Sequence, residues 1–379
     1  MIYMDNAATS FPKAPGVSRA VARALDSPLG NAGRPSSIPA LDASRIAFAA
    51  RTELAALLGT HESKRLIFTK NATEALNLAI MGSVPRDGSL AFSCLEHNSV
   101  TRPARRLAAE RGVRLIIFDC DARGRPDPES LTAAIAASPD LLVVTAASNV
   151  TGAVTPFEEI VERCRLAGVP TLVDASQAVG HLPIALDDIG PSAFCFAGHK
   201  GLLGPEGTGG LWLGALFDPE PLLSGGTGSD SASELQPRAL PDRYEAGTQN
   251  APALAGLLEA VRFLAHTGLA EVRRREIELR DHFSSALARL PRLRLLGPGP
   301  GERSVPVLSI VAQGMTPGEL ALELGRRGIA ARPGLHCAPS AHKVLGTLDE
   351  GGTLRLSPGF FTSDSELDEV VEAFEEILS

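Results

Sequence analysis

The chain has 379 residues, of which 44% are hydrophobic and 21% are charged. A chain of this length can form one large domain with a smaller second one, and its composition is typical of a folded globular protein. Lys and Arg total 36 against 44 Asp and Glu, a formal net charge of -8, and no basic run is present. We therefore expect no surface for nucleic acid or for an anionic membrane.

The N-terminus and the cysteines indicate the compartment. Residues 1–6 do not form a basic segment followed by an apolar core, and no later window approaches the roughly 20 apolar residues of a membrane span. We expect a cytoplasmic protein. The cysteines are widely spaced, without a CxxC pair or a histidine pattern typical of zinc, so free thiols and no metal site are expected. They are Cys94, Cys120, Cys164, Cys195 and Cys337.

The first elements of the chain predict a helix, a strand and a second helix. Apolar and alanine positions recur at helical spacing over residues 41–58, and a short strand is expected at 66–69. The strand leads into a helix that opens at Asn71, Ala72 and Thr73. The free N–H groups of a helix start, with a nearby hydroxyl, form a good phosphate site. The alternative is an ordinary N-cap formed by Asn71 or Thr73.

Short apolar runs alternate with helical stretches up to residue 213. The runs are 90–93, 114–118, 141–145, 171–174, 193–197 and 210–213, and the helices are 99–110, 128–137 and 158–167. This alternation predicts an α/β fold with a mainly parallel sheet. Ligands bind beyond the carboxyl ends of the strands in such sheets, so the polar residues that follow the strands are candidate site residues. They are His97, Asn149, Asp174, Gln177, His199 and Lys200.

The remainder of the chain predicts a second, smaller domain. Residues 216–244 are rich in Gly, Ser, Pro and Asp and predict a long loop. A long helical stretch from 251 to 290 is the expected connection. An α+β unit follows, with strands at 305–311 and 353–357 and helices at 317–327 and 365–378. We predict a large domain at 15–262 and a small one at 263–379, with residues 1–14 packed alongside the small domain.

Lys200 is the residue that points to a cofactor. It follows the apolar strand 193–197 and precedes a glycine-rich turn. An amine at the end of a buried strand is partly desolvated, so its neutral form is accessible near neutral pH and it can form a Schiff base. This favours pyridoxal phosphate (PLP). The alternative is a lysine that caps the strand with its ammonium group in water.

The other strand-end residues supply the remaining contacts that PLP needs. Asp174 can pair with the pyridinium nitrogen and His97 can stack on the ring. Asn149 and Gln177 can reach the phenolic oxygen. The residues expected at the phosphate are Ala72, Thr73 and His199. Each residue also has an ordinary interpretation, with Asp174 as a helix cap, His97 as a core histidine and Asn149 as a turn residue. Four polar strand ends in one sheet favour the cofactor site.

Taken in order, these motifs resemble the class V branch of PLP-dependent enzymes, and within it the cysteine desulfurase and selenocysteine lyase family. The motifs that carry the resemblance are Tyr3-Met4-Asp5-Asn6-Ala7-Ala8-Thr9, Asn71-Ala72-Thr73-Glu74, Glu96-His97-Asn98, Ser148-Asn149-Val150-Thr151-Gly152, Asp174-Ala175-Ser176-Gln177, Gly198-His199-Lys200, Glu245-Ala246-Gly247-Thr248 and Arg332-Pro333-Gly334-Leu335-His336-Cys337. The resemblance implies the aspartate-aminotransferase-like fold, PLP fold type I, with a seven-stranded sheet. It also implies a homodimer in which Thr248 contacts the phosphate bound by the other subunit.

Cys337 distinguishes a desulfurase from other class V enzymes. In the family, a cysteine in an Arg-x-Gly-x-His-Cys segment takes sulfur from the substrate, and here Arg332, Gly334 and His336 occupy the other positions. A cysteine beside arginine and histidine in a glycine-bearing loop is expected to hold more thiolate. The loop at 338–349 is short, which resembles the group II branch. The alternative is a loop cysteine without a role, in an aminotransferase, lyase or epimerase of the same class.

The resemblance implies that L-cysteine or L-selenocysteine is the substrate. Lys200 removes the α-proton, alanine leaves, and a persulfide on Cys337 is passed to a thiol acceptor, such as a sulfur-acceptor protein. Arg355 is the predicted ligand of the substrate carboxylate, since bidentate pairing suits that group, and Arg332 is second. The alternative interpretation is that both arginines are surface charges. Asn31 is the third predicted substrate residue.

Two positions depart from the family pattern. Ala197 stands where many relatives carry a phosphate-binding serine or threonine, and Ser37 lies near a position where relatives often carry histidine. The sequence therefore leaves open one phosphate contact and the choice between cysteine and selenocysteine as substrate. A third interpretation is a catalytically silent protein of this fold, against which the presence of Lys200, Asp174 and Cys337 argues.

Overall fold

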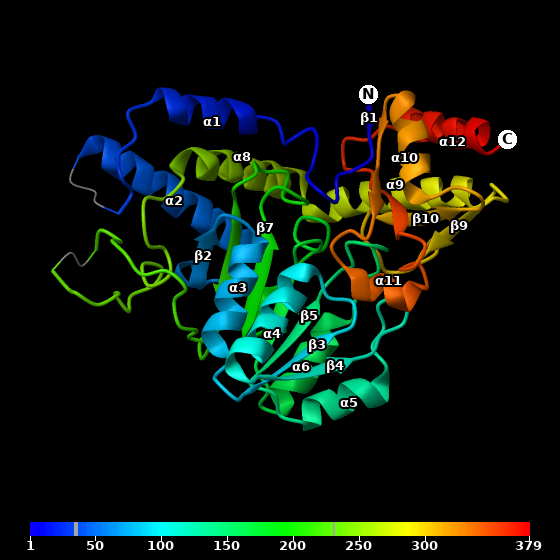
Figure 1. The fold of residues 1–379 in the computed structure, drawn as a ribbon. Coiled ribbons are helices and arrows are strands. Elements are labelled where there is room, and N and C mark those ends of the chain that lie inside the picture. Colours follow the sequence, from blue (N-terminus) through cyan, green and yellow to red (C-terminus); the bar gives the residue numbers. More distant parts are fainter. Residues whose placement is uncertain (34–36, 230–231) are drawn as a thin grey trace.

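The computed structural model describes residues 1–33, 37–229 and 232–379 and contains a central seven-stranded sheet (Figure 1). Its strands are β2 (Leu66–Thr69), β3 (Ser89–Ser93), β4 (Arg114–Phe118), β5 (Leu141–Thr145), β6 (Thr171–Asp174), β7 (Ala193–Ala197) and β8 (Gly209–Leu213). They lie in the order β2-β8-β7-β6-β5-β3-β4. Strand β8 runs antiparallel to both of its neighbours, and the other pairs are parallel. The predicted mainly parallel sheet is confirmed.

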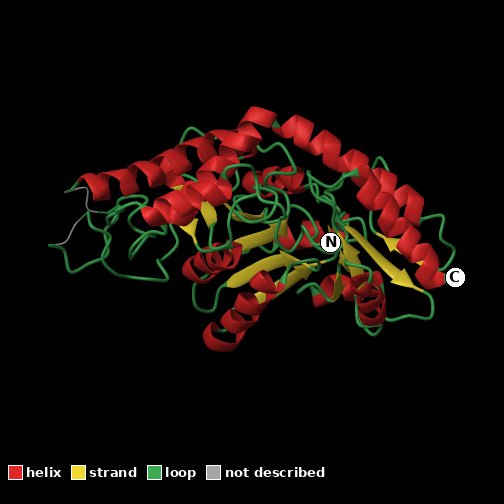
Figure 2. Ribbon diagram, turned by 90° about the horizontal axis from the view of Figure 1, so that it is seen from above, coloured by secondary structure: helices red, strands yellow, loops and turns green. Residues whose placement is uncertain are grey.

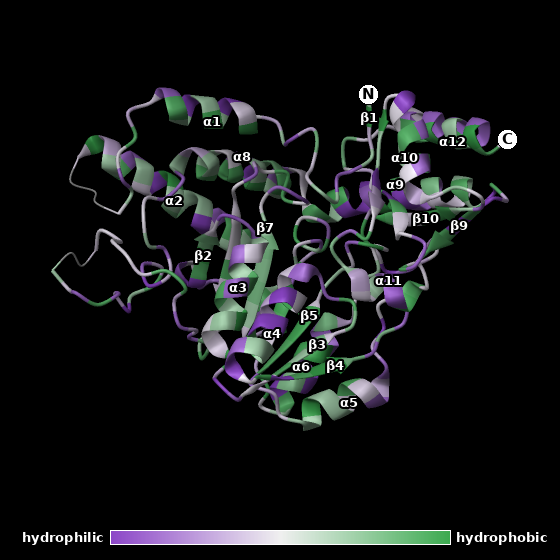
Figure 3. Cartoon of the chain, viewed as in Figure 1, coloured by the Kyte–Doolittle hydropathy of each residue, from purple (hydrophilic) through white to green (hydrophobic). Residues whose placement is uncertain are grey.

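The strands are apolar on both faces because helices cover both faces. In β5, Leu141 and Val143 belong to one hydrophobic cluster, whereas Leu142 and Val144 belong to another. Successive side chains of a strand point to opposite faces, so the two clusters are the two sides of one sheet. The hydrophobic character of β3, β5 and β7 is visible in Figure 3.

Two groups of helices enclose the sheet (Figure 2). Helices α3 (Ala72–Ser83) and α4 (Asn98–Arg111) contribute to one cluster. The other face is covered by α2 (Ile38–Leu57), α5 (Pro128–Ala136), α6 (Phe157–Leu166), the short α7 (Leu186–Ile189) and α8 (Ala251–Thr267). Helix α1 (Val17–Asp26) packs on α8, and a 3-10 turn spans Ser63–Arg65.

A second unit contains a four-stranded antiparallel sheet in the order β12-β13-β10-β9. Its strands are β9 (Leu293–Leu296), β10 (Leu308–Ala312), β12 (Arg332–Gly334) and β13 (Thr353–Leu356), and its helices are α9 (Leu269–Leu287), α10 (Pro317–Arg326), α11 (Pro339–Leu345) and α12 (Asp364–Leu378). The N-terminal strand β1 (Ile2–Tyr3) pairs with β11 (Ile329–Ala330) in this unit. Both chain ends therefore lie in it (Figure 1).

The long helical stretch predicted from 251 to 290 is two helices. Gly268 separates α8 from α9 at a φ of 86°, and the two helix axes differ by 84°. A positive φ is favourable only for glycine, which explains the break at this residue. Within α9, Val272 packs in the core of the central sheet, while Leu279 packs in the core of the second unit. The predicted boundary after residue 262 lies inside α8, and the division into domains stays a prediction.

Among the described residues, no single helix is long and apolar enough to cross a membrane; α8 and α9 meet that test only as a bent pair. The predicted loop between 216 and 244 contains no helix or strand in its described residues. All five cysteines are free thiols, as expected, and Cys337 is exposed.

Candidate active site

The carboxyl ends of the parallel strands surround a cavity. It is lined by Asn71, Ala72, Thr73, His97, Ser99, Thr145, Ala147, Asn149, Asp174, Ser176, Gln177, Ala197, His199 and Lys200. All of the predicted cofactor residues except Thr248 are in this set. Strands β2, β3, β5, β6 and β7 each deliver at least one of them, because parallel strands end at the same edge of a sheet.

Lys200 lies in the turn that follows β7. Its carbonyl accepts a hydrogen bond from the Leu203 N–H at 2.8 Å, and the Gly204 N–H donates to the Gly198 carbonyl at 2.9 Å. Burial lowers the pKa of Lys200 to about 8, opposed by attraction to Asp174. A lysine that caps the strand with its ammonium group in water would not be shifted in this way. A substantial fraction of the amine is therefore neutral near physiological pH.

Asp174 is the last residue of β6 and is 5% exposed. Its Oδ1 accepts hydrogen bonds from the N–H and hydroxyl of Ser176, and from the Cys195 thiol at 3.6 Å. In the described part of the chain, Oδ2 has no such partner. One carboxylate oxygen is thus fixed and the other is available to a ligand in the cavity.

His97 is the N-cap of α4, and its Nδ1 accepts a hydrogen bond from the Ser99 N–H at 3.0 Å. The Ser99 hydroxyl lies 2.8 Å from the same nitrogen. Burial lowers the pKa of His97 to about 4, despite attraction to Asp174. The ring is therefore neutral at physiological pH and held in one orientation, as stacking on a flat ligand requires. Nδ1 is thus occupied by the helix cap, while the ring still lines the cavity.

The N-terminus of α3, where an anion site is predicted, lines the cavity. Asn71 is the N-cap, and its Oδ1 accepts from the Glu74 N–H at 2.9 Å. Thr73 remains available, with its hydroxyl 3.0 Å from that of Ser99. Nearby, His199 Nδ1 is buried without a hydrogen-bond partner in the described residues, and burial lowers its pKa to about 4. Helix N–H groups, hydroxyls and an imidazole are donors that suit a phosphate.

The amide side chains of Gln177 and Asn149 each donate one hydrogen bond to a backbone carbonyl. Gln177 donates from Nε2 to the Ala7 carbonyl at 2.8 Å, and its Oε1 is buried without a partner in the described structure. Asn149 donates from Nδ2 to the His336 carbonyl at 2.6 Å. Each amide nitrogen carries a second proton, so both side chains retain a donor for an oxygen in the cavity.

The residues present fit PLP. A flat ring with a basic nitrogen, a phosphate and an aldehyde needs a carboxylate, an anion site and an accessible amine, and Asp174, the α3 N-terminus and Lys200 supply these. Two buried polar atoms without partners in the described residues, Gln177 Oε1 and His199 Nδ1, also suit a polar ligand in the cavity.

Cys337 lies on a loop that docks against the start of α4. Its carbonyl accepts a hydrogen bond from the Asn98 N–H at 2.7 Å, next to His97, and its side chain is exposed. The backbone φ is 57° at Cys337 and 48° at His336. Two consecutive non-glycine residues with positive φ are unusual and are typical of a functional loop. The loop brings Cys337 to the side of the sheet that carries the cavity.

The expected influence of His336 on Cys337 is wrong. The His336 ring is buried, with Nε2 3.0 Å from the Thr353 hydroxyl. Burial and the charge of Arg355 lower its pKa to about 2, so it carries no positive charge at physiological pH. Arg355, in contrast, is charged and interacts electrostatically with Cys337.

Arg355 and Arg332 lie opposite each other in the pairing of β12 with β13. Arg355 is 2% exposed; its Nη2 is 2.7 Å from Asp5 Oδ1, and its Nη1 donates to the Asn149 carbonyl at 3.0 Å. Arg332 is partly exposed and has no ion pair in the described structure. Two guanidinium groups with one carboxylate leave a net positive charge, which favours binding of an anionic group.

Thr248 and Asn31 lie outside the cavity. Both are exposed, and Asn31 Nδ2 is 3.4 Å from Thr248 Oγ1. The loop before Thr248 is held by a buried pair in which Arg51 and Glu245 make two contacts of 2.8 Å. Asn31 is therefore not a neighbour of Arg355 within one chain, and the predicted role of Thr248 requires a second subunit. Ser37 is the N-cap of α2, and Ala197 lines the cavity.

Several residues of the site were not predicted from the sequence. Ser99 and Ser176 orient His97 and Asp174, and each stands two residues after its partner, which was a usable signal. Asp5, which holds Arg355, is 350 residues away in sequence and gave no such signal. Glu96 is fully buried, accepts from the Thr145 N–H at 2.8 Å, and has its pKa raised to about 8 by burial.

Comparisons with known proteins agree with this geometry. Residues 2–370 match the model of the family Aminotransferase class-V. A probable cysteine desulfurase of Aeropyrum pernix is 34% identical, covering 100% of this chain and 95% of that protein. One of Methanothermobacter thermautotrophicus is 31% identical over 99% and 94% of the two chains. The apo structure of a cysteine desulfurase from Thermococcus onnurineus has 28% identity and a TM-score of 0.92, over 100% and 94% of the chains. The predicted fold is confirmed.

Proposed function

Since the chain belongs to the class-V aminotransferase family and within it to the cysteine desulfurases, we propose that it removes sulfur from L-cysteine with PLP as cofactor. The products are L-alanine and a persulfide on Cys337. The observation that supports this most directly is an exposed cysteine, on a loop bonded to Asn98, beside a cavity that contains an amine with a pKa near 8. L-selenocysteine is the alternative substrate.

When bound, PLP supplies an electron sink for the bonds of the substrate α-carbon. Lys200 provides the amine that holds the cofactor and then the base for the α-proton, because its neutral form is populated near pH 8. Asp174 would hold the ring nitrogen in its protonated form through Oδ2. His97 would stack on the ring, and its low pKa would keep it from adding a positive charge there.

Sulfur transfer takes place at Cys337. The Cys337 thiolate attacks the sulfur of the substrate, a bond forms between the two sulfur atoms, and the bond between sulfur and the substrate β-carbon breaks. The electron pair of that bond goes to the β-carbon, which takes a proton and becomes the methyl group of alanine. The substrate carbon is reduced and the sulfur is oxidised, so no external oxidant is needed. The persulfide passes to a thiol acceptor, such as an acceptor protein.

A homodimer is part of the proposal. Thr248 is exposed and does not line the cavity of its own subunit, which suits a contact with the phosphate site of a second subunit. Large apolar side chains of α2 and of the loop before Thr248 are also exposed, including Ile38 at 76%, Phe48 at 69% and Leu223 at 60%. Apolar surface of this kind is typical of subunit interfaces. Five free thiols suit a reducing compartment, so the cytoplasm is the proposed location.

Product analysis tests the proposed function. The purified holoenzyme is incubated with L-cysteine and, separately, with L-selenocysteine under reducing conditions. We expect alanine together with an equal amount of sulfide or selenide. Formation of a 2-oxo acid without sulfide would contradict the proposal and favour an aminotransferase in which Cys337 has no role.

Arg355 is proposed to bind the substrate carboxylate. Because Arg355 is buried and held by Asp5 and Asn149, its charge is poorly screened. We expect Arg355→Lys to raise the KM for L-cysteine about 10-fold or more, whereas Arg332→Lys has a smaller effect. Arg294→Lys, on the exposed side of β9 in the same sheet, is the matched control. A larger increase for Arg332→Lys would assign the carboxylate to that residue instead.

A further inference from the structure

His181 and Glu276 form a buried pair outside the cavity. Glu276 lies on the inner side of α9, and its Oε2 is 2.7 Å from His181 Nδ1. The Glu276 side chain is 3% exposed and the His181 side chain is 11% exposed. A carboxylate accepts, so Nδ1 is the donor and its tautomer and ring orientation are fixed by Glu276. Arg273, on the same helix, donates to the His181 carbonyl at 3.4 Å.

The His181 ring packs directly on the turn that carries Lys200. A Cβ at Gly201 would lie 2.7 Å from both Cδ2 and Nε2 of His181 and 2.4 Å from the Val179 carbonyl oxygen. In the other direction, a Cβ at Gly180 would lie 2.1 Å from the Gly201 carbonyl. Neither contact tolerates a side chain, so the segment 179–181 and the residue after Lys200 are packed backbone to backbone.

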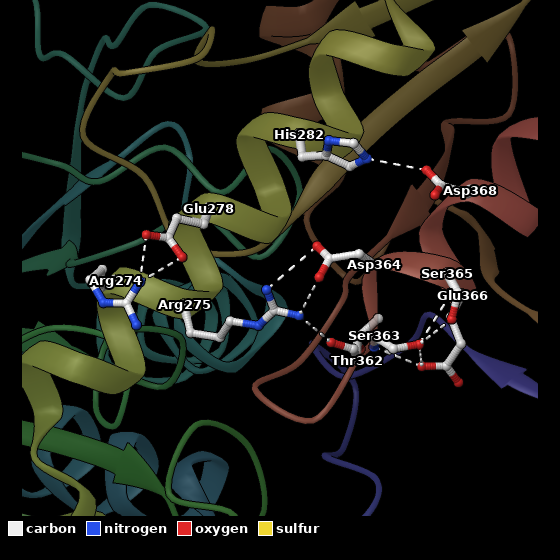
Figure 4. Close-up of polar contacts among 10 residues, drawn as sticks. All are labelled: Arg274, Arg275, Glu278, His282, Thr362, Ser363, Asp364, Ser365, Glu366 and Asp368. Atoms are coloured by element: carbon white, nitrogen blue, oxygen red, sulfur yellow. Dashed lines mark hydrogen bonds and ion pairs between the residues drawn. The ribbon is translucent and has the colours of Figure 1, made fainter.

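The exposed polar contacts of α9 are of a different kind. Figure 4 shows its outer side, where Arg275 contacts Asp364 and Thr362, and His282 contacts Asp368. The His282 and Asp368 side chains are 51% and 63% exposed, and they connect α9 to α12 without touching the cavity. Exposed pairs contribute little to stability. The chain thus offers two histidine–carboxylate pairs on one helix, of which only one contacts the lysine turn.

We infer that His181 and Glu276 are positioning residues for Lys200. Glu276 orients the His181 ring, the ring and the Val179 carbonyl confine Gly201, and Gly201 limits where the neighbouring amine can lie. Helix α9, which also carries core residues of the second unit, is thereby coupled to the lysine. The inference rests on the proposed function only in taking Lys200 as the cofactor amine.

Competitive labelling of the full-length apoprotein with trace acetic anhydride tests this inference. Labelling of the Lys200 peptide is followed by mass spectrometry over the neutral to alkaline range, and this does not depend on desulfurase activity. The wild-type midpoint is expected at about 8. His181→Asn keeps a donor for Glu276 but removes the ring atoms next to Gly201. We expect its midpoint to rise by about one pH unit, toward the value of an ordinary lysine.

Two Glu276 variants separate positioning from general packing. Glu276→Gln retains an oxygen that accepts from Nδ1 and is expected to behave as wild type, whereas Glu276→Ala is expected to follow His181→Asn. In the holoenzyme, both defective variants should lose roughly 10- to 100-fold in kcat with little change in KM, because misplacement affects the reacting amine and not the carboxylate site. His282→Ala is the control with an unchanged midpoint.

The inference is overturned if folded His181→Asn and Glu276→Ala proteins give the wild-type Lys200 midpoint, or if His282→Ala shifts it equally. Folding is checked by near-ultraviolet circular dichroism, and if Glu276→Ala does not fold, His181→Asn decides. A shifted midpoint in an enzyme that releases no sulfide would uphold the positioning role and reject the proposed reaction.

Discussion

Replacing Cys337 with alanine is expected to reduce sulfide release from L-cysteine by roughly 10³-fold or more, because the residue that accepts sulfur is removed. The fold and the cofactor site should be unaffected. Cys337 is exposed, and the contact of its loop with Asn98 is made by a backbone carbonyl that alanine retains. The visible absorbance of bound PLP should therefore remain.

Cys94→Ala is the matched control, since Cys94 is partly exposed but does not line the cavity. Its activity should equal that of the wild type. Mass spectrometry after one turnover, without an added thiol, should find one extra sulfur atom on the peptide that contains Cys337. Undiminished sulfide release by Cys337→Ala would show that another group accepts the sulfur.

The central sheet could be predicted from the sequence because both of its faces are buried. Strands β2, β5, β6 and β7 have the bounds expected from their continuous apolar runs. Continuous burial gives a local signal that needs no knowledge of partners. The same reasoning located the cavity, because parallel strands deliver the residues that follow them to a single edge.

The elements that escaped prediction have only a weak local pattern. Helix α1 is ten residues long and is buried chiefly through Val17, Ala20 and Ala24, and strand β9 is only partly buried. Short, half-exposed elements form because of their neighbours, in this case α8 and β10, and not because of their own periodicity.

The features of the site that could not be predicted depend on contacts between segments that are distant in the sequence. The sequence placed His336 beside Cys337 and suggested a shared electrostatic effect, but the ring is turned into the core toward Thr353. Likewise, nothing near Arg355 in sequence indicated that Asp5 would hold it. Side-chain direction and pairing across the fold determine charge, and neither can be read from adjacency in the chain.

Lys200→Met is expected to reduce turnover by about 10⁴-fold or more, since the variant loses both the amine that holds the cofactor and the base. The second effect of this substitution is on the stability of the apoprotein, which we expect to increase. Burial lowers the pKa of Lys200 from 10.5 to about 8. Below about pH 8 the amine is charged in both the folded and unfolded states, so the folded protein bears the full cost of a desolvated charge.

Between these two pKa values the unfolded chain binds more protons than the folded one, and the stability of the wild-type apoprotein rises with pH. Methionine carries no charge. Urea denaturation should therefore find apo Lys200→Met more stable than wild type at neutral pH, with the difference shrinking as the pH rises from about 8 toward 10.5. Lys64, whose side chain is 65% exposed, provides the control, because Lys64→Met should show no pH-dependent difference. A difference for Lys200→Met that stays constant with pH would mean that Lys200 is not desolvated.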